Sequence, residues 1–257
     1  NIGIIPTPLN YYSNYNSNLM VDASIQITGS HNPSEYNGFK ITFNKKPFFG
    51  DDIQLLYRMI VEKEFISGEG KLSKYDIKSD YLKMIESKIN VNKKIKVAMD
   101  CGNAAGCIVA PELYKLFNIE LFELYCDVDG KFPNHHPDPT VDSNLSDLQK
   151  FTIKNNCDVG IAFDGDADRI VALDQDGGII RSDILMSLFL PKLIIENDSI
   201  VYDVKCSKAL EDMIIKYKGK PVMWKTGHSL IKNKMKEVNA KLGGEMSGHI
   251  FFADDYY

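Results

Sequence analysis

A serine lies between a glycine and a histidine in the segment Thr28–Pro33. Gly29 allows another group to approach the backbone closely, and Ser30 offers a hydroxyl. A serine hydroxyl is a weak nucleophile until a base or a metal ion assists it. His31 and Lys40 are the candidates for that assistance. The alternative interpretation is a polar turn with an exposed histidine.

A second segment, Asp164–Arg169, carries three carboxylates at alternate positions. Asp164, Asp166 and Asp168 follow an apolar run and could converge on one divalent cation. Ligation by oxygen alone suits Mg²⁺, which could offset charge on a phosphoryl group. Arg169 could form two hydrogen bonds to a phosphate or a carboxylate. The alternative is an acidic turn without a ligand.

A third segment, Gly243–His249, is rich in glycine and contains Glu245 and Ser247. These two residues are two positions apart, so on an extended loop their side chains point the same way. Such a pair suits recognition of neighbouring sugar hydroxyls. A glycine-rich linker is the alternative.

Two weaker segments follow predicted strands, namely Val204–Ser207 and Lys225–Ser229. Each places polar or cationic groups just before a predicted helix, where anions can bind, although simple helix capping accounts for them equally well. The segment Phe132–Pro139 contains three prolines and the pair His135–His136. Adjacent side chains point apart in an extended chain, so we expect a connecting loop there and no metal site.

The elements that must position these residues alternate between strand and helix. Apolar runs bounded by turns predict strands, and apolar residues at helical spacing predict helices. The sequence therefore predicts an α/β fold of consecutive domains with mixed, largely parallel sheets flanked by helices. The predicted strands are 2–6, 24–28, 39–43, 95–99, 158–163, 170–173, 199–204 and 222–224. The predicted helices begin at 51, 105, 182, 207 and 230, with others around 82–89 and 145–151.

Composition limits the class of protein. The 257 residues are 44 % hydrophobic and 25 % charged, as in ordinary globular proteins, with a formal charge of -5 that disfavours general nucleic-acid binding. The five cysteines form no CxxC pair, which favours a reducing cytoplasm over a disulfide framework. The longest apolar stretch is too short to span a bilayer. We expect a cytoplasmic protein without nucleic-acid or membrane partners, either a monomer or a weak homodimer.

Together, Thr28–Pro33, Asp164–Arg169 and Gly244–His249 resemble three loops of the α-D-phosphohexomutases, and within them the bacterial phosphomannomutase/phosphoglucomutase group. The resemblance implies that Ser30 is the phosphorylated residue and that its phosphate and the three loop aspartates hold one Mg²⁺. It implies that Lys40, His31 and Arg169 assist transfer around Ser30. It further implies roles in sugar and phosphate binding for Glu245 and Ser247, at the 3- and 4-hydroxyls, and for Lys205, His228 and His249.

The resemblance also implies an activity and a domain layout. The activity is interconversion of a hexose 1-phosphate and a hexose 6-phosphate, of mannose or glucose, through phosphoserine and a hexose 1,6-bisphosphate. The layout is the latter part of domain 1 (1–75), domain 2 (76–177) and an incomplete domain 3 (178–257). The early part of domain 1 and a fourth, phosphate-binding domain are expected to lie outside this sequence, so the activity of this piece alone is a separate question.

Two other functions stay open on the residues alone. One is a metal-dependent sugar phosphatase with an aspartate nucleophile in the Asp164–Asp168 segment. The other is a non-catalytic module that retains the fold. A stable phosphate on Ser30 would favour the mutase, and a labile acyl phosphate would favour the phosphatase.

Overall fold

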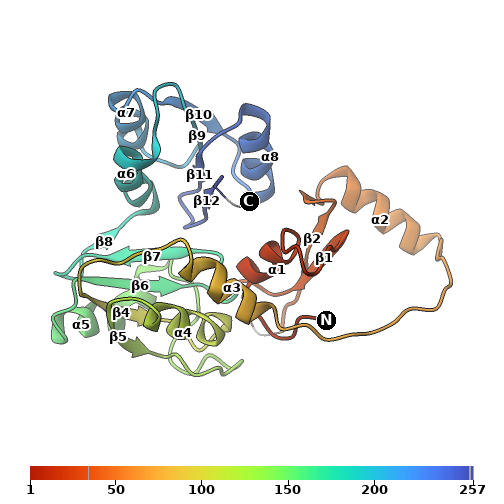
Figure 1. The fold of residues 1–257 in the computed structure, drawn as a ribbon, viewed down its shortest axis with the longest axis horizontal. Helices are drawn as coiled ribbons and strands as arrows, with labels where there is room; N and C mark the ends of the chain where they lie inside the picture. The colour runs from red at the N-terminus through yellow and green to blue at the C-terminus, as the bar shows by residue number, and fades with distance from the viewer. Residues whose placement is uncertain (34, 255, 257) are drawn as a thin grey trace.

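The computed structural model describes residues 1–33, 35–254 and 256. Within these residues the strands form three separate sheets, each accompanied by helices (Figure 1). The helices are α1 (Thr7–Ser13), α2 (Asp51–Val61), α3 (Ile77–Glu86), α4 (Ala110–Lys115), α5 (Ser146–Lys154), α6 (Ser182–Leu193), α7 (Lys208–Lys216) and α8 (His228–Val238), with short 3-10 helices η1 (Ala105–Ile108) and η2 (Asp142–Leu145).

The first sheet is small and antiparallel, with the order β1 (Ala23–Ile27), β2 (Phe39–Phe43), β3 (Lys46–Pro47). Helix α1 packs against β1. The strand predicted at residues 2–6 is wrong, because the chain there pairs with no strand and enters α1 directly after Pro6. Pro8 lies in the first turn of α1, where its missing N–H is not needed.

The second sheet has five strands in the order β5 (Ile119–Leu124), β4 (Ile95–Asp100), β6 (Val159–Phe163), β7 (Ile170–Leu173), β8 (Ile179–Ile180). Strands β5, β4 and β6 are parallel, and β7 and β8 continue antiparallel. Side chains alternate across β4: Val97 and Met99 pack with Ala110 of α4, and Ala98 packs with Leu148 of α5. Helices therefore cover both faces, which explains the nearly continuous apolar sequence of β4.

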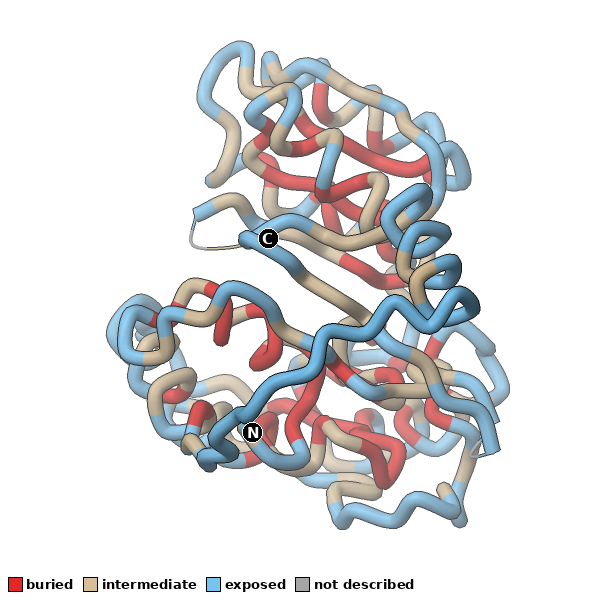
Figure 2. Tube along the Cα trace, turned by 90° about the vertical axis from the view of Figure 1, so that its right-hand side faces the viewer, coloured by how far each residue is buried: buried red, intermediate tan, exposed pale blue. Residues whose placement is uncertain are grey.

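The third sheet has the order β10 (Lys220–Trp224), β9 (Ser199–Asp203), β11 (Leu242–Gly244), β12 (Ile250–Phe252). Its first three strands are parallel and β12 is antiparallel. Ile200 and Tyr202 of β9 pack with residues of α6 and α7, whereas Val201 packs with Ile231 and Met235 of α8. Buried stretches run through the interior of the tube in Figure 2, whereas residues 62–74, after α2, are exposed.

The predicted α/β class with mixed sheets and flanking helices is confirmed, although the first sheet is antiparallel throughout. Most predicted strands and helices are present within a few residues of their predicted bounds. The helix predicted from Ala105 is interrupted: η1 ends at Ile108 and α4 begins at Ala110, with Pro111 in its first turn. No helix among the described residues is long and apolar enough to cross a membrane.

Four of the polar loops begin where parallel strands end. Residues 164–169 follow β6, 204–207 follow β9, 225–227 follow β10 and 245–249 follow β11. The carboxyl ends of parallel strands are the usual place for ligands in α/β sheets. The fold therefore places these four loops at the carboxyl ends of strands in the second and third sheets.

Candidate active site

Ser30 lies in the loop between β1 and β2 and faces the loop after β6. Its Oγ lies 3.3 Å from Asp164 Oδ2 and 3.2 Å from Asp166 Oδ1. Ser30 has a positive φ of 53°, and its backbone N–H donates to Thr28 Oγ1 at 2.8 Å. Positive φ is unusual for serine, so the neighbouring hydrogen bond holds a turn that aims the hydroxyl at the aspartates.

The two loops touch closely at Gly165. A Cβ added to Gly165 would lie 2.0 Å from the carbonyl oxygen of Ser30, which is far inside contact distance. Only glycine therefore lets the Ser30 loop rest on the acidic loop.

The acidic loop forms a cluster suited to a divalent cation. Carboxylate oxygens of Asp164, Asp166 and Asp168 lie within 4.8 Å of one another. All three residues are nearly or fully buried, and hard oxygen ligands of this kind fit Mg²⁺. Burial, and next the charges of Asp168 and Asp166, raise the pKa of Asp164 to about 8. Three carboxylates crowd together in this loop, so the residues present fit a bound cation.

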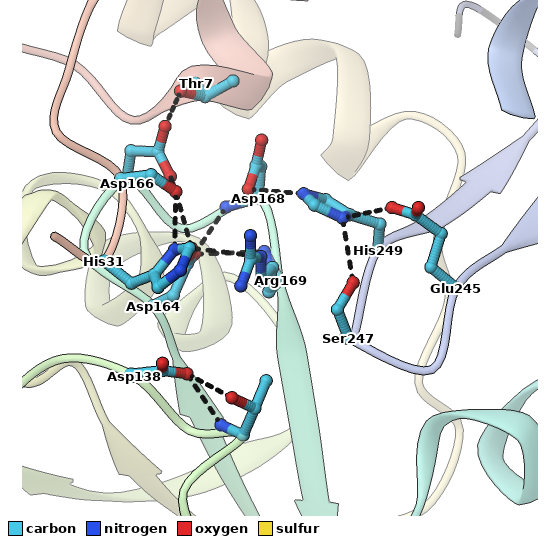
Figure 3. A network of polar contacts seen from close by, with 12 residues as sticks. Thr7, His31, Asp138, Asp164, Asp166, Asp168, Arg169, Glu245, Ser247 and His249 are labelled. Atoms are coloured by element: carbon cyan, nitrogen blue, oxygen red, sulfur yellow. Dashed lines mark hydrogen bonds and ion pairs between the residues drawn. The ribbon is translucent and has the colours of Figure 1, made fainter. Parts of the chain in front are cut away.

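Lys40 and Thr7 also donate to Asp166. Lys40 Nζ lies 2.6 Å from Asp166 Oδ2 and 2.6 Å from Asp168 Oδ2. Burial opposes the charge on Lys40, but the charges of Asp168 and Asp166 raise the pKa of Lys40, which keeps it protonated. Thr7 at the start of α1 donates from Oγ1 to Asp166 Oδ2 at 2.6 Å (Figure 3).

His31 and Arg169 lie on either side of the serine hydroxyl and the aspartates. His31 Nδ1 is 3.3 Å from Ser30 Oγ. Burial, and next the charge of Arg169, lower the pKa of His31, so its imidazole is neutral and can accept a proton. Arg169 Nε is buried, lies 3.6 Å from Asp164 Oδ2 and has no hydrogen-bond partner among the described residues.

His249 links the acidic loop to the loop after β11. Its Nε2 lies 3.0 Å from Asp168 Oδ1, and its Nδ1 lies 2.7 Å from Glu245 Oε2 (Figure 3). Burial works against a charge on this ring, yet the hydrogen bonds to Asp168 and Glu245 raise the pKa of His249 to about 9. Because both ring nitrogens face carboxylates, His249 is an imidazolium that joins the second and third sheets.

A cleft of about 660 Å³ opens beside His249 and Arg169. Its walls come from the second and third sheets. Burial, and next the charge of Lys232, lower the pKa of His228 to about 3, and Nδ1 of this neutral ring has no partner among the described residues. The cleft is therefore lined by groups that can bind an anionic, hydroxylated ligand. The predicted substrate-binding residues that line it are Lys205, His228, Glu245, Ser247 and His249.

The structure thus brings all the predicted site residues into one region. Ser30, His31, Lys40 and the three aspartates form its polar centre, and the remaining residues extend along the cleft. Thr7 was not predicted, because nothing in the sequence around it indicates a contact 159 residues away.

The loop 132–139 contacts the Ser30 loop, a role that the sequence did not indicate. It connects β5 to η2, as predicted, and His135 donates from Nε2 to Asp100 Oδ2 at 2.9 Å. His136 Nε2 donates to the backbone carbonyl of His31. The histidine pair therefore braces the Ser30 loop from the second sheet. Three prolines and two histidines in one short loop were the available signal.

Comparison with known proteins agrees with this geometry. Three domain models described as phosphoglucomutase/phosphomannomutase, alpha/beta/alpha domains I, II and III, match residues 1–66, 79–178 and 181–257. The phosphomannomutase/phosphoglucomutase of Pseudomonas aeruginosa is 44 % identical over the whole chain, and the phosphoglucomutase of Neisseria gonorrhoeae is 38 % identical. The alignments cover 55 % and 56 % of those relatives, so the chain spans about half their length.

Solved structures agree as well. A phosphoglucomutase/phosphomannomutase family protein from Burkholderia thailandensis superposes with a TM-score of 0.95 at 41 % identity, over 100 % of this chain and 58 % of that protein. A structure from Thermus thermophilus, at 18 % identity, shares the fold with a TM-score of 0.83 over 98 % of this chain and 59 % of that one. With three consecutive domain models matched along almost its full length, the chain belongs to the phosphoglucomutase/phosphomannomutase family.

Proposed function

We propose that the protein containing this chain is a phosphohexomutase that interconverts hexose 1-phosphate and hexose 6-phosphate, of glucose or mannose, through a phosphoserine at Ser30. One observation carries the proposal. The Ser30 hydroxyl lies within 3.3 Å of Asp164 and Asp166, with Lys40 on the same carboxylate cluster. Names of relatives as phosphomannomutase and phosphoglucomutase support the choice of sugar phosphates.

In the first half-reaction a hydroxyl of the hexose monophosphate attacks phosphorus on Ser30. The bond between phosphorus and Ser30 Oγ breaks, and a bond to the sugar oxygen forms. The attacking hydroxyl loses a proton and Ser30 Oγ takes one up as it leaves phosphorus; His31, which is neutral and 3.3 Å from Ser30 Oγ, can relay this proton. Lys40 and Arg169 place positive charge beside the transferred group, where phosphoryl transfer is assisted mainly by position and electrostatics.

The acidic loop would hold Mg²⁺ through Asp164, Asp166 and Asp168, together with a phosphate oxygen on Ser30. Bound there, the cation supplies charge neutralisation for the phosphoryl oxygens. A Mg²⁺ complex is known for one structural relative, a fungal N-acetylphosphoglucosamine mutase, at 16 % identity. The buried cluster and the raised pKa of Asp164 support the same assignment in this chain.

The cleft beside His249 would bind the sugar and its second phosphate. Glu245 and Ser247 would contact neighbouring hydroxyls, and Lys205 and His228 would contact the phosphate. The hexose 1,6-bisphosphate must turn around and bind again before it returns its other phosphate to Ser30. Contacts to the 3- and 4-hydroxyls can serve both orientations, because these hydroxyls exchange places on reversal.

Turnover of the full-length protein tests the proposal. Glucose 1-phosphate and mannose 1-phosphate, each with Mg²⁺ and a trace of the bisphosphate, should yield the 6-phosphates in a coupled assay. Ser30→Ala should reduce this rate to background, whereas Ser146→Ala, at the start of the distant helix α5, should leave it unchanged. Retention of more than a few per cent of the rate in Ser30→Ala would reject Ser30 as the nucleophile.

A further inference from the structure

Three of the five cysteines gather at one end of the second sheet, behind the acidic loop. Cys101 follows β4, Cys107 lies in η1 and Cys126 follows β5. The sulfur atoms of Cys126 and Cys101 are only 3.2 Å apart. Cys157 and Cys206 belong to other packing clusters. No CxxC spacing marks this group in the sequence.

The backbone around the two close sulfurs suits a cross-link. Strands β4 and β5 are parallel neighbours with Asp100 opposite Leu124, and Cys101 N–H donates to the Leu124 carbonyl at 3.3 Å. Cys126 is thus one residue beyond the position opposite Cys101. The two sulfurs, 3.2 Å apart, must close to about 2.05 Å to form the bond.

The two thiols differ in exposure. Cys101 is fully buried, whereas Cys126 is half-buried and can meet a small oxidant. Hydrogen bonds with Cys107 and Cys126, and burial, raise the pKa of Cys101 far above its usual range, so Cys101 stays a thiol. Of the close pair, Cys126 is thus the sulfur that peroxide can reach, and Cys101 is the sulfur placed 3.2 Å away to react with it.

We propose that Cys101 and Cys126 form a reversible disulfide when the protein meets hydrogen peroxide. The Cys126 thiol gives up its proton and its sulfur attacks one peroxide oxygen. The O–O bond breaks, and the departing hydroxide takes up that proton, so a sulfenic acid and one water are produced. Cys101 then displaces the hydroxyl from the Cys126 sulfur, and its proton leaves with that hydroxyl as a second water. The two sulfurs together lose two electrons, and the peroxide gains two.

The cysteine pair lies close to the acidic loop, residues 164–169. A Cβ added to Gly106 would lie 3.7 Å from Cys101 Sγ and 3.5 Å from Ala167 Cβ, in the middle of the acidic loop. The neighbouring Ala105 N–H donates to the Gly165 carbonyl at 3.1 Å. The disulfide would therefore form one layer behind the carboxylate cluster. In a reducing compartment such bonds are typically transient and redox-sensing.

Peptide mapping of the reduced protein after brief treatment with one equivalent of hydrogen peroxide tests the proposal. Intact mass should fall by two hydrogens and return after dithiothreitol. Cys101 and Cys107 share one tryptic peptide and Cys126 lies in the next, so fragment-ion sequencing of the cross-linked pair must place the bond at Cys101.

Matched variants sharpen the result. Cys126→Ser should lose the fall in mass, and Cys157→Ser, which removes a buried thiol of the same sheet outside the cluster, should keep it. Wild-type protein that only gains oxygen atoms would overturn the proposal, as would a cross-link that joins Cys107 instead of Cys101. The wild-type peptide map decides the matter even where a variant fails to fold.

Discussion

Ser30 Oγ lies 3.2 Å from Asp166 Oδ1, although 136 residues separate them in the sequence. Two loops from different sheets must be held together to achieve this. Gly165 provides the space, Lys40 and Thr7 hold Asp166, and His136 holds the backbone of His31. The candidate site therefore lies where two sheets meet, and changes in the contacts there should alter the position of the Ser30 hydroxyl.

Removal of one carboxylate should weaken Mg²⁺ binding. In Asp166→Asn a charged oxygen ligand is lost from a buried cluster of three. Loss of a residue that only supports a metal ligand typically costs about 10–100-fold in affinity, so we expect at least a tenfold increase in Kd. Isothermal titration calorimetry measures the Kd for Mg²⁺. The control Asp176→Asn changes an exposed aspartate in the turn after β7 and should leave the Kd unchanged. If Asp166→Asn binds Mg²⁺ as tightly as the wild type, the metal assignment is contradicted.

Gly165→Ala should push the Ser30 loop away from the acidic loop. The new Cβ would overlap the Ser30 carbonyl at 2.0 Å, so the backbone must shift. Overpacking of this kind costs about 1–3 kcal/mol of unfolding free energy. Denaturant unfolding measures the cost, and Gly130→Ala is the matched control, because a Cβ there meets nothing within 4 Å. Equal stabilities of the two variants would show that the loops are not in contact.

Thr7→Val should destabilise the protein by removing a buried donor to Asp166. The shape of the side chain is preserved, and the lost hydrogen bond to a charged group contributes about 1.5–3 kcal/mol. Thermal unfolding monitored by circular dichroism checks this. Thr140→Val removes a hydroxyl that donates to Asp138 at the surface and should change stability by less than about 0.5 kcal/mol. A Thr7 variant as stable as the Thr140 variant would refute the role given to Thr7.

The brace at His135 should make stability depend on pH. The hydrogen bond to Asp100, despite opposing burial, raises the pKa of His135 above its usual value near 6.5. A raised folded-state pKa means that the stabilisation is complete below about pH 6.5 and is lost as pH rises through the folded-state pKa. The melting temperature of the wild type should therefore fall as the pH rises from about 6.5 through the folded-state pKa of His135.

His135→Gln provides the comparison for this effect. Glutamine can still donate to Asp100 but does not titrate. The difference in melting temperature between wild type and variant should shrink as the pH is raised. A difference that stays constant from about pH 6 to about pH 9 would mean that His135 carries no stabilising charge.

Much of the fold could be read from local pattern. Apolar runs such as Ile95–Met99 and helical spacing such as that after Asp51 identify elements without knowledge of their neighbours. The strand predicted at residues 2–6 was wrong because a local pattern does not show whether a partner strand exists. The apolar sequence there is compatible with a strand, but it pairs with none and leads into α1. Strands β11 and β12 are three residues each, too short to produce a pattern.

The candidate site was predictable where chemistry is concentrated in a loop. Three aspartates in one segment, or Glu245 near Ser247, stand out because few other roles need them together. Thr7 and His136 were not predictable, because each acts through one contact made by tertiary packing. The distance between Ser30 and the aspartates likewise depends on how two domains meet, which no local pattern encodes.

Phosphate mapping on Ser30 tests the central claim most directly. The full-length protein is incubated with glucose 1,6-bisphosphate and Mg²⁺, digested and sequenced by mass spectrometry, with Ser30→Ala treated in parallel. We predict one acid-stable phosphoryl group on Ser30 in the wild type and none in the variant. An unmodified Ser30, or a hydroxylamine-labile phosphate on an aspartate of the 164–168 loop, would contradict the account.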